Sequence, residues 1–339
     1  MENESKISDG RAVYMRKKKT PSQWLRSRKG QKVMIIFLFM VIPLTLLVIF
    51  TYLPFGKMVE FSFLKMKYLG KRTPVGWQNY IDVFKRDDIF KALTLSIYYM
   101  VASIVQLGLA LYLATVLSFK TKGGKFFKGS IFFPYLISGI AVGFIFKFFY
   151  TRGFVFDSVL TTIGFDLENL PRWLSDMKVN NISLAATSVW RYMGQNMVLF
   201  IGAIMSVDAE MYEAADLDGA SKWQKFKYII LPSISSIVLL NLILSISGSL
   251  SAFEPPFVIT GGTAETATYF VKMHDLAHNT GKVGLACAMA VVLMLIIVLV
   301  TVLQKLFFHI MFDNRSDVSK TTQRRLRKLN GRYEVGGGN

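Results

Sequence analysis

Few residues of the types that carry out chemistry lie at productive spacings in this sequence. The stretch "TKGGKFFKGS" comes nearest to a phosphate-binding loop, but Phe126 stands where a magnesium-binding hydroxyl is needed. His274 and His278 in "HDLAH" have the spacing of a zinc site, yet Asp275 replaces the usual general-base Glu and no third ligand is evident. The sequence therefore predicts that the chain does not hydrolyse ATP alone, and we expect the His pair to lie on a polar outer-loop helix.

The ionisable side chains in or near the long apolar runs are Lys147, Arg191 and Glu254, and Glu254 lies at a boundary. An ion-coupled carrier normally has carboxylates or histidines within its spans, because coupling to protons or sodium needs a group that changes charge. The sequence contains no chain of such groups. Transport powered by this chain itself is therefore not expected.

Polar side chains at helical spacing in two apolar runs are candidates for a solute path. The candidates are Arg191, Tyr192, Gln195 and Asn196 in one run, and Asn241, Ser245 and Ser249 in the next. Neighbours four residues apart share one face of a helix. Amides, hydroxyls and an aromatic ring suit a neutral sugar, which offers hydroxyl donors and acceptors together with apolar ring faces. The alternative is that these groups only join helices to one another by hydrogen bonds.

The elements that would position these residues are membrane-spanning helices. The chain has 339 residues, of which 52% are apolar and 18% charged, and its apolar residues form long runs rather than being dispersed. Six runs approach or exceed the roughly 20 residues that cross a bilayer. They cover residues 33–53, 92–118, 129–150, 182–207, 228–252 and 283–304. We therefore predict an all-α membrane protein with six transmembrane helices.

Basic residues set the predicted orientation and the domain boundaries. Lys and Arg cluster in the segment 1–32 and the tail 313–339, which flank a transmembrane domain at 33–312. A third cluster lies in the loop 119–128 within that domain. With six spans all three clusters share one side, which the positive-inside rule makes the cytoplasm. Both termini and the loop after the fourth run are then cytoplasmic. The net charge of +18 could instead indicate nucleic acid, but these clusters flank spans and suit anionic lipid head groups, so no nucleic-acid partner is expected.

The loop "EAADLDGASKWQKFKYIILP", residues 213–232, is predicted to be a helix, a tight turn and a second helix. Gly219 after Asp218 can take the left-handed conformation that ends a helix, and Ser221 with Gln224 forms a capping box for the next one. Small residues keep the turn narrow enough to enter a groove on a partner. A docking element is the functional interpretation, and an ordinary surface helical hairpin is the alternative.

This loop resembles the EAA loop of ATP-binding-cassette importer permeases. The family pattern is E-A-A, then D-G-A three residues on, then I-x-L-P. The matching residues are Glu213, Ala214, Ala215, Asp218, Gly219, Ala220, Ile229, Leu231 and Pro232. The resemblance implies the importer permease fold, in which the loop docks into a cytoplasmic ATPase subunit as a coupling helix. The ATPase-docking residues it assigns are Glu213, Ala214, Ala215, Asp218, Gly219 and Ala220.

Further motifs resemble the carbohydrate branch of that family. They are "WQNY" at 77–80 followed by Phe84, "FFPYLIS" at 132–138, Trp190 with Gly194, and "ITGGTAETAT" at 259–268. Two positions depart from the family pattern: Thr263 replaces the usual Pro of the last motif, and Ser235 replaces a frequent second Pro. The resemblance implies a sugar or oligosaccharide as substrate. A non-sugar solute such as glycerol phosphate is the alternative, and a membrane enzyme or stand-alone carrier is a third hypothesis.

The resemblance also implies the partners. The basic N-terminus and the long first outer loop are similar to the first of two non-identical permeases, so we expect a heterodimer with a second permease subunit in a bacterial cell (inner or cytoplasmic) membrane. Two copies of a cytoplasmic ATPase subunit and an extracytoplasmic solute-binding protein would complete the complex. The chain itself is then a transport subunit that binds no cofactor, because ATP and Mg belong to the ATPase subunits.

Overall fold

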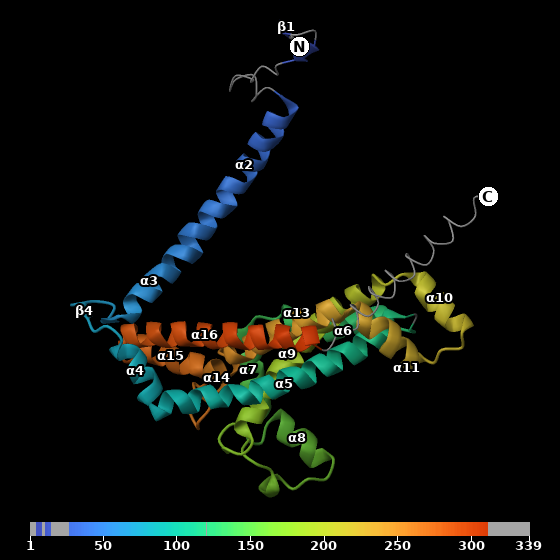
Figure 1. Cartoon of the computed structure of the whole chain (residues 1–339). Helices are drawn as coiled ribbons and strands as arrows, with labels where there is room; N and C mark the ends of the chain where they lie inside the picture. Colours follow the sequence, from blue (N-terminus) through green and yellow to red (C-terminus); the bar gives the residue numbers. More distant parts are fainter. Residues whose placement is uncertain (1–4, 9–10, 15–26, 120, 311–339) are drawn as a thin grey trace. The chain divides into compact units, whose positions relative to one another are not determined.

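The computed structural model describes residues 5–8, 11–14, 27–119 and 121–310, and most of them are helical (Figure 1). Most of the predicted basic segment 1–32 and the whole predicted tail 313–339 lie outside the described residues. The chain divides into two compact units, Met1–Glu60 and Phe61–Asn339. Each unit is described by itself below.

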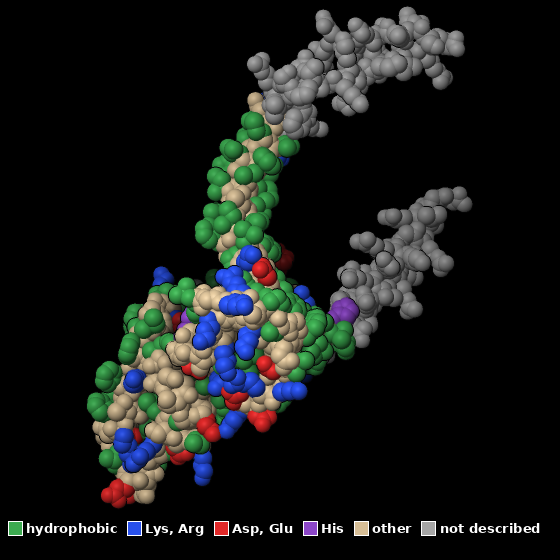
Figure 2. Space-filling view, turned by 90° about the vertical axis from the view of Figure 1, so that its left-hand side faces the viewer, with side chains coloured by type: hydrophobic (Ala, Val, Ile, Leu, Met, Phe, Trp, Pro, Cys, Tyr) green, Lys and Arg blue, Asp and Glu red, His purple; other side chains and the backbone are tan. Residues whose placement is uncertain are grey.

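The first unit is a short hairpin and one long apolar helix. Strands β1 (Ser5–Ser8) and β2 (Arg11–Tyr14) pair antiparallel. Helix α2 (Arg28–Leu47) begins after Ser27, whose side chain accepts a hydrogen bond from the Gly30 amide. The helix continues through the π-helical turn η1 (Val48–Tyr52) into α3 (Leu53–Ser62). Apolar side chains lie along the visible face of α2 (Figure 2), as a helix that faces lipid requires.

The second unit contains the remaining helices and one small hairpin. The longer helices are α5 (Asp87–Ser118), α6 (Gly124–Leu136), α7 (Gly139–Tyr150), α9 (Asn180–Met205), α13 (Ser235–Leu250) and α16 (Val283–Phe308). The shorter helices are α4 (Gln78–Lys85), α8 (Val155–Thr162), η2 (Leu167–Asn169), α10 (Ala209–Leu217), α11 (Lys222–Lys225), η3 (Phe226–Ile230), α12 (Leu231–Ser233), α14 (Glu254–Ile259) and α15 (Tyr269–His278). Strands β3 (Leu64–Lys65) and β4 (Thr73–Pro74) pair antiparallel.

All six predicted runs form helices, and four helices are long and apolar enough to cross a membrane. These four are Gly30–Ser62, Asp87–Ser118, Ser235–Ile259 and Val283–Phe308. Helices α6 and α7 would form a fifth span as a pair that is bent by 98°. Helix α9 is 26 residues long, which is sufficient length, but it is not among these four. The number of six spans therefore stays a prediction.

The bend between α6 and α7 has a local cause. Pro134 lies in the last turn of α6, and the Ser138 side chain accepts a hydrogen bond from the Ala141 amide as the N-cap of α7. Tight packing holds α7 in its new direction, because a Cβ added at Gly139 would collide with the Glu254 carboxylate of α14. The break therefore brings α14 against α7.

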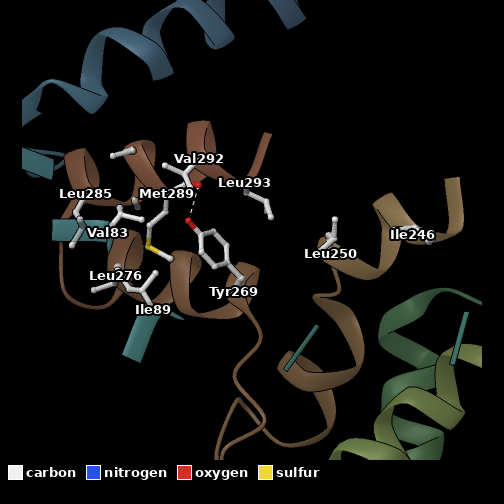
Figure 3. Packing of buried hydrophobic residues seen from close by; sticks show 12 residues of the cluster. Val83, Ile89, Ile246, Leu250, Tyr269, Leu276, Leu285, Met289, Val292 and Leu293 are labelled. Carbon is white, nitrogen blue, oxygen red and sulfur yellow. Dashed lines mark hydrogen bonds between the residues drawn. The ribbon is translucent and has the colours of Figure 1, made fainter. Parts of the chain in front are cut away.

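One hydrophobic core joins α15 and α16 to α4, α5 and α13 (Figure 3). Tyr269 is 1% exposed, and its hydroxyl donates a hydrogen bond of 3.0 Å to the Met289 carbonyl. A second core lies between α5, α9 and η3, and Phe200 and Ile230 are each 1% exposed within it. The two cores fix α5 against α9 and α13, the helices that carry the candidate path residues.

The end of the second unit where α4 and α15 lie is polar. Figure 2 looks onto this end and shows Lys and Arg side chains interspersed with Asp and Glu. Asp88 pairs there with Arg86 at 2.8 Å and with Lys272 at 3.0 Å. Side chains of this kind belong in water, so this end of the helices lies outside the hydrocarbon layer.

Candidate functional site

A cavity of about 480 Å³ lies between α5, α9, α13 and the segment that leads into α14. Its volume falls within the range of small-molecule sites in proteins. Six of the seven candidate path residues line it: Tyr192, Gln195, Asn196, Asn241, Ser245 and Ser249. The structure thus brings together side chains from two separate runs of the sequence on the wall of one cavity.

Arg191, the seventh candidate, does not line the cavity. Its guanidinium donates to the Glu254 carboxylate and, at 3.1 Å, to the Tyr192 hydroxyl. The same guanidinium carbon lies 5.0 Å from the centre of the Tyr192 ring, a cation–π geometry. Arg191 therefore braces two residues of the cavity wall.

Sequence reasoning missed the contribution of α5. Tyr99, Ser103 and Gln106 line the cavity, and all three are buried. They follow one another at three- and four-residue intervals, so they share a helix face. The same spacing test that singled out the fourth and fifth runs could have found them in the second.

Two buried polar atoms of cavity-lining residues have no hydrogen-bond partner among the described residues: the Tyr99 hydroxyl and Asn241 Oδ1. The Asn241 amide nitrogen is used, because it donates to the Ile237 carbonyl at 2.9 Å. Leaving a buried donor or acceptor unpaired is costly.

Part of the polar stripe on α13 serves helix packing instead. The Ser249 hydroxyl is 3.0 Å from the Tyr99 carbonyl of α5 and 2.8 Å from the Ser245 carbonyl of its own helix. Both acceptors belong to the protein backbone. The packing alternative thus describes Ser249 well, whereas Asn241 keeps a free acceptor among the described residues.

The cavity wall carries little charge. Among the described lining residues, Glu254 is the only Asp, Glu, Lys, Arg or His. Its carboxylate forms an ion pair with Arg191. The other lining groups are amides, hydroxyls, the aromatic rings of Tyr99, Tyr192 and Phe253, and small apolar residues. Such a wall suits a neutral ligand with both hydroxyl groups and apolar faces.

The loop after α9 has the predicted helix, turn and helix. Gly219 has φ +70° and ends α10, with its amide bonded to the Asp216 carbonyl and the Ala220 amide to the Ala215 carbonyl. This is the Schellman arrangement. Ser221 and Gln224 then form both hydrogen bonds of the capping box. The prediction of local structure is confirmed here.

The loop presents its turn to solvent. Glu213, Ala214, Asp218 and Gly219 are exposed, Ala220 is half-buried and Ala215 is buried. Leu217, which the sequence interpretation did not single out, is 90% exposed. A single exposed Leu is common on protein surfaces, so Leu217 adds apolar area to the turn without by itself marking an interface.

Contacts at its base fix the loop. The Tyr212 ring meets Phe119 at the end of α5 edge to face, 5.6 Å between centres, and its hydroxyl donates to the Ile204 carbonyl. Burial raises the pKa of Tyr212, so its phenol stays neutral near pH 7. Lys225 pairs with Asp216 and ties α11 to α10. The loop is therefore anchored to both α5 and α9.

The His pair forms part of an aromatic stack. The rings of His274 and His278 are 4.4 Å apart between centres; His274 also contacts Phe257, and His278 stacks on Tyr68. Among the residues that the structure describes, no group of three His, Cys, Asp or Glu side chains is placed to hold a metal ion.

Comparison with known proteins decides which family this architecture represents. The family model described as binding-protein-dependent transport system inner membrane component matches residues 106–311, which include the cavity residues of α9 and α13 and the whole loop 213–232. The chain belongs to this family. The resemblance found in the sequence is thereby confirmed.

Relatives at the sequence level are permeases. The chain is 31% identical over 287 residues to the probable ABC transporter permease protein YurN of Bacillus subtilis, with 82% of this chain and 97% of the relative covered. It is 30% identical over 273 residues to the multiple sugar-binding transport system permease protein MsmF of Streptococcus mutans, with 78% and 92% covered. Members of this family are transport subunits rather than enzymes.

A solved structure shares the fold. One chain of the bacterial alginate ABC transporter, in complex with an alginate pentasaccharide-bound periplasmic protein, matches with a TM-score of 0.71 at 18% identity. The match covers 83% of this chain and 96% of that chain. The predicted fold class, an all-α importer permease that crosses the membrane several times, is confirmed.

Proposed function

We propose that this chain is the transmembrane subunit of an ATP-driven importer and forms, with a second permease, the path for a neutral sugar or oligosaccharide. The observation that carries the proposal is the cavity of about 480 Å³, whose wall holds hydroxyl and amide side chains from α5, α9 and α13. These are the hydrogen-bonding groups that a sugar hydroxyl can use. The path residues are Tyr192, Gln195, Asn196, Asn241 and Ser245, with Arg191 as a brace behind them.

The substrate class follows from the chemistry of the wall. The name of MsmF refers to multiple sugars, and the solved transporter takes alginate, so carbohydrate import supports this substrate class. The acidic lining residue, Glu254, is paired with Arg191, and the described lining residues include no Lys, Arg or His that would bind a negatively charged solute. We therefore favour a neutral carbohydrate over an acidic one and over glycerol phosphate, the non-sugar alternative.

The partners follow from the loop. The exposed turn at Glu213, Ala214, Asp218 and Gly219, with bare Leu217, is the surface on which a cytoplasmic ATPase subunit would dock, one copy for each permease. ATP and Mg would be bound by those subunits. A solute-binding protein would deliver the sugar on the opposite side of the membrane, by analogy with the periplasmic protein that is bound to the alginate transporter.

In the proposed orientation, this loop and both termini face the cytoplasm of a bacterial cell. Lys222, Lys225 and Lys227 lie in and beside the loop, and Lys122, Lys125 and Lys128 lie in and after the turn that follows α5. The positive-inside rule puts both clusters on the cytoplasmic side. The polar end formed by α4 and α15 then faces outward and is the surface available to the solute-binding protein.

ATP hydrolysis by purified components tests the proposal. The chain alone in detergent should hydrolyse ATP at background rate. Adding the second permease and the ATPase subunits should produce hydrolysis that rises further with solute-loaded binding protein. Hydrolysis by the chain alone, or an ATPase that neither associates with this chain nor responds to it, would show that the proposal is wrong.

A further inference from the structure

A second cavity, of about 750 Å³, lies on the opposite side of α5 from the proposed path. Its walls are the C-terminal third of α5 and the segment α11–η3. Gly108, Tyr112 and Phe119 belong to the first wall, and Trp223 and Phe226 belong to the second. The lining is mainly apolar, and Lys222 and Lys225 lie on it beside the aromatic residues. We call this cavity the α5 groove.

The α5 groove has the length of one leaflet of a bilayer. It runs along α5 from Gly108 to Phe119, which are eleven residues apart. At about 1.5 Å of rise per residue this distance is about 16 Å. The hydrocarbon core of a membrane is about 30 Å thick, so one leaflet contributes about 15 Å. An acyl chain that lies along α5 would therefore fill the groove from end to end.

One end of the groove has the composition of a membrane–water interface. Trp223, next to Lys222 in the sequence, is 68% exposed, and Trp is enriched at head-group level. Lys225 is neutralised by its pair with Asp216. Lys222 is exposed and makes no ion pair with any described residue, so its ammonium is available to an anion at the mouth of the groove.

We propose that the α5 groove binds one anionic glycerophospholipid, with an acyl chain along α5 and its phosphate beside Lys222. The charge of Lys222 complements a phosphate, and the groove below it offers apolar surface and an unobstructed Gly108. A packed protein helix would match the apolar wall but would not account for an ammonium that has no ion-pair partner among the described residues at the same end. The proposal needs α5 to span the membrane and does not depend on the ATPase-docking role of the loop.

A lipid bound in this position would also affect the loop 213–232. The groove joins the end of α5 to α11 and η3, the second half of the loop 213–232. A bound lipid would fill the space between them and hold this half of the loop against the second span. Anionic lipid would therefore stiffen the connection between the exposed turn and the membrane helices.

Native mass spectrometry of the complete transporter tests lipid binding directly. The complex is purified from bilayers of phosphatidylcholine and phosphatidylglycerol, and the lipids it retains are counted. We expect one phosphatidylglycerol per copy of this chain. Gly108→Leu should abolish retention, because a Cβ at Gly108 meets nothing within 4 Å and the new side chain would occupy the groove. Gly202→Leu is the matched control, since Gly202 is equally open but lies on α9.

The head-group contact has its own pair of variants. Lys222→Gln should lower the preference for phosphatidylglycerol over phosphatidylcholine about fivefold, the effect of one lysine at an anionic surface. Lys227→Gln is the control, because Lys227 lies over the Tyr228 ring and outside the groove. If all four variants retained as much phosphatidylglycerol as the unaltered chain does, the proposal would be overturned. Thr115→Cys lies in the groove. If it formed a disulfide with a cysteine introduced on another helix of either permease, a protein segment would occupy the groove and the proposal would be wrong.

Discussion

At the scale of single residues, the cavity wall combines groups that are already satisfied with groups that are not. The Ser249 hydroxyl and the Asn241 amide nitrogen bond to backbone carbonyls, which fixes both side chains. The Tyr99 hydroxyl and Asn241 Oδ1 have no partner among the described residues. Side chains fixed in this way keep the shape of the cavity, and the amides and hydroxyls that line it can hydrogen-bond a hydroxylated solute.

The first prediction concerns Gln195 and Asn196. Replacing both by Ala should lower uptake of the sugar, because each change removes hydrogen bonds worth about 0.5–1.5 kcal/mol net. Each lost bond corresponds to at most about a tenfold change in affinity. Uptake of labelled sugar by cells that express the whole complex measures the effect, with co-purification of the subunits as the check on assembly. Wild-type uptake would remove both residues from the path, and loss of assembly would favour helix packing.

The residues of the site could be predicted only where polar side chains recur at helical spacing within an apolar run. Tyr192, Gln195 and Asn196 stand out as polar residues in an apolar run, and the structure places them on the cavity. Arg191 satisfies the same test but points to Glu254, and no spacing rule can reveal a partner 63 residues away. Burial of a charge requires such a partner, so a lone Arg in a predicted span indicates an ion pair as readily as a ligand contact.

At the scale of elements, the shape of the turn after α10 depends on the left-handed backbone of one residue, Gly219. The second prediction is that Gly219→Val reduces association with the ATPase and transport, while membrane insertion persists. A β-branched residue is strained at φ +70°, and left-handed backbone costs an L-residue about 1–2 kcal/mol. Gly219→Asn is the matched control, because Asn tolerates this conformation, and it should retain most of the activity. Full ATPase binding in the Val variant would contradict the docking role.

The third prediction concerns the close approach of α6 and α9. A Cβ at Gly194 would lie 2.0 Å from the Ile131 carbonyl oxygen, whereas a Cβ at Gly202 on the same helix meets nothing within 4 Å. Ala normally stabilises a helix over Gly by about 0.5–1 kcal/mol. Gly202→Ala should therefore leave the thermal stability of the purified complex unchanged or raised, while Gly194→Ala should lower it by forcing α6 away from α9. Equal stability of the two variants would mean that the helices are not packed this closely.

The elements were predictable to the extent that they depend on local pattern. The loop 213–232 follows from a left-handed glycine and a capping box, both of which are short-range signals. The run 129–150 was predicted as one span because its apolar residues continue across the 98° break between α6 and α7, although Pro134 and Ser138 lie at that break. That break depends on the Ser138 cap together with the packing of Gly139 against α14, a contact between distant segments.

At the scale of the whole molecule, the second unit connects the loop 213–232 directly to the cavity. The loop follows α9 and leads through α12 into α13, and both α9 and α13 line the cavity. A partner that moves the turn at Gly219 would therefore pull on two walls of the path at once. This connectivity explains how an ATPase on one side of the membrane could open and close a site within the bilayer.

The most direct test of this account is ATP-dependent transport in proteoliposomes that contain this chain, the second permease and the ATPase subunits. Labelled sugar with its binding protein is supplied on one side and Mg-ATP on the other. We predict accumulation against the gradient that requires ATP and stops when this chain is omitted, and Gly219→Val should reduce it. Accumulation by this chain without the ATPase subunits, driven by an ion gradient, would contradict the central claim that the energy source lies outside the chain.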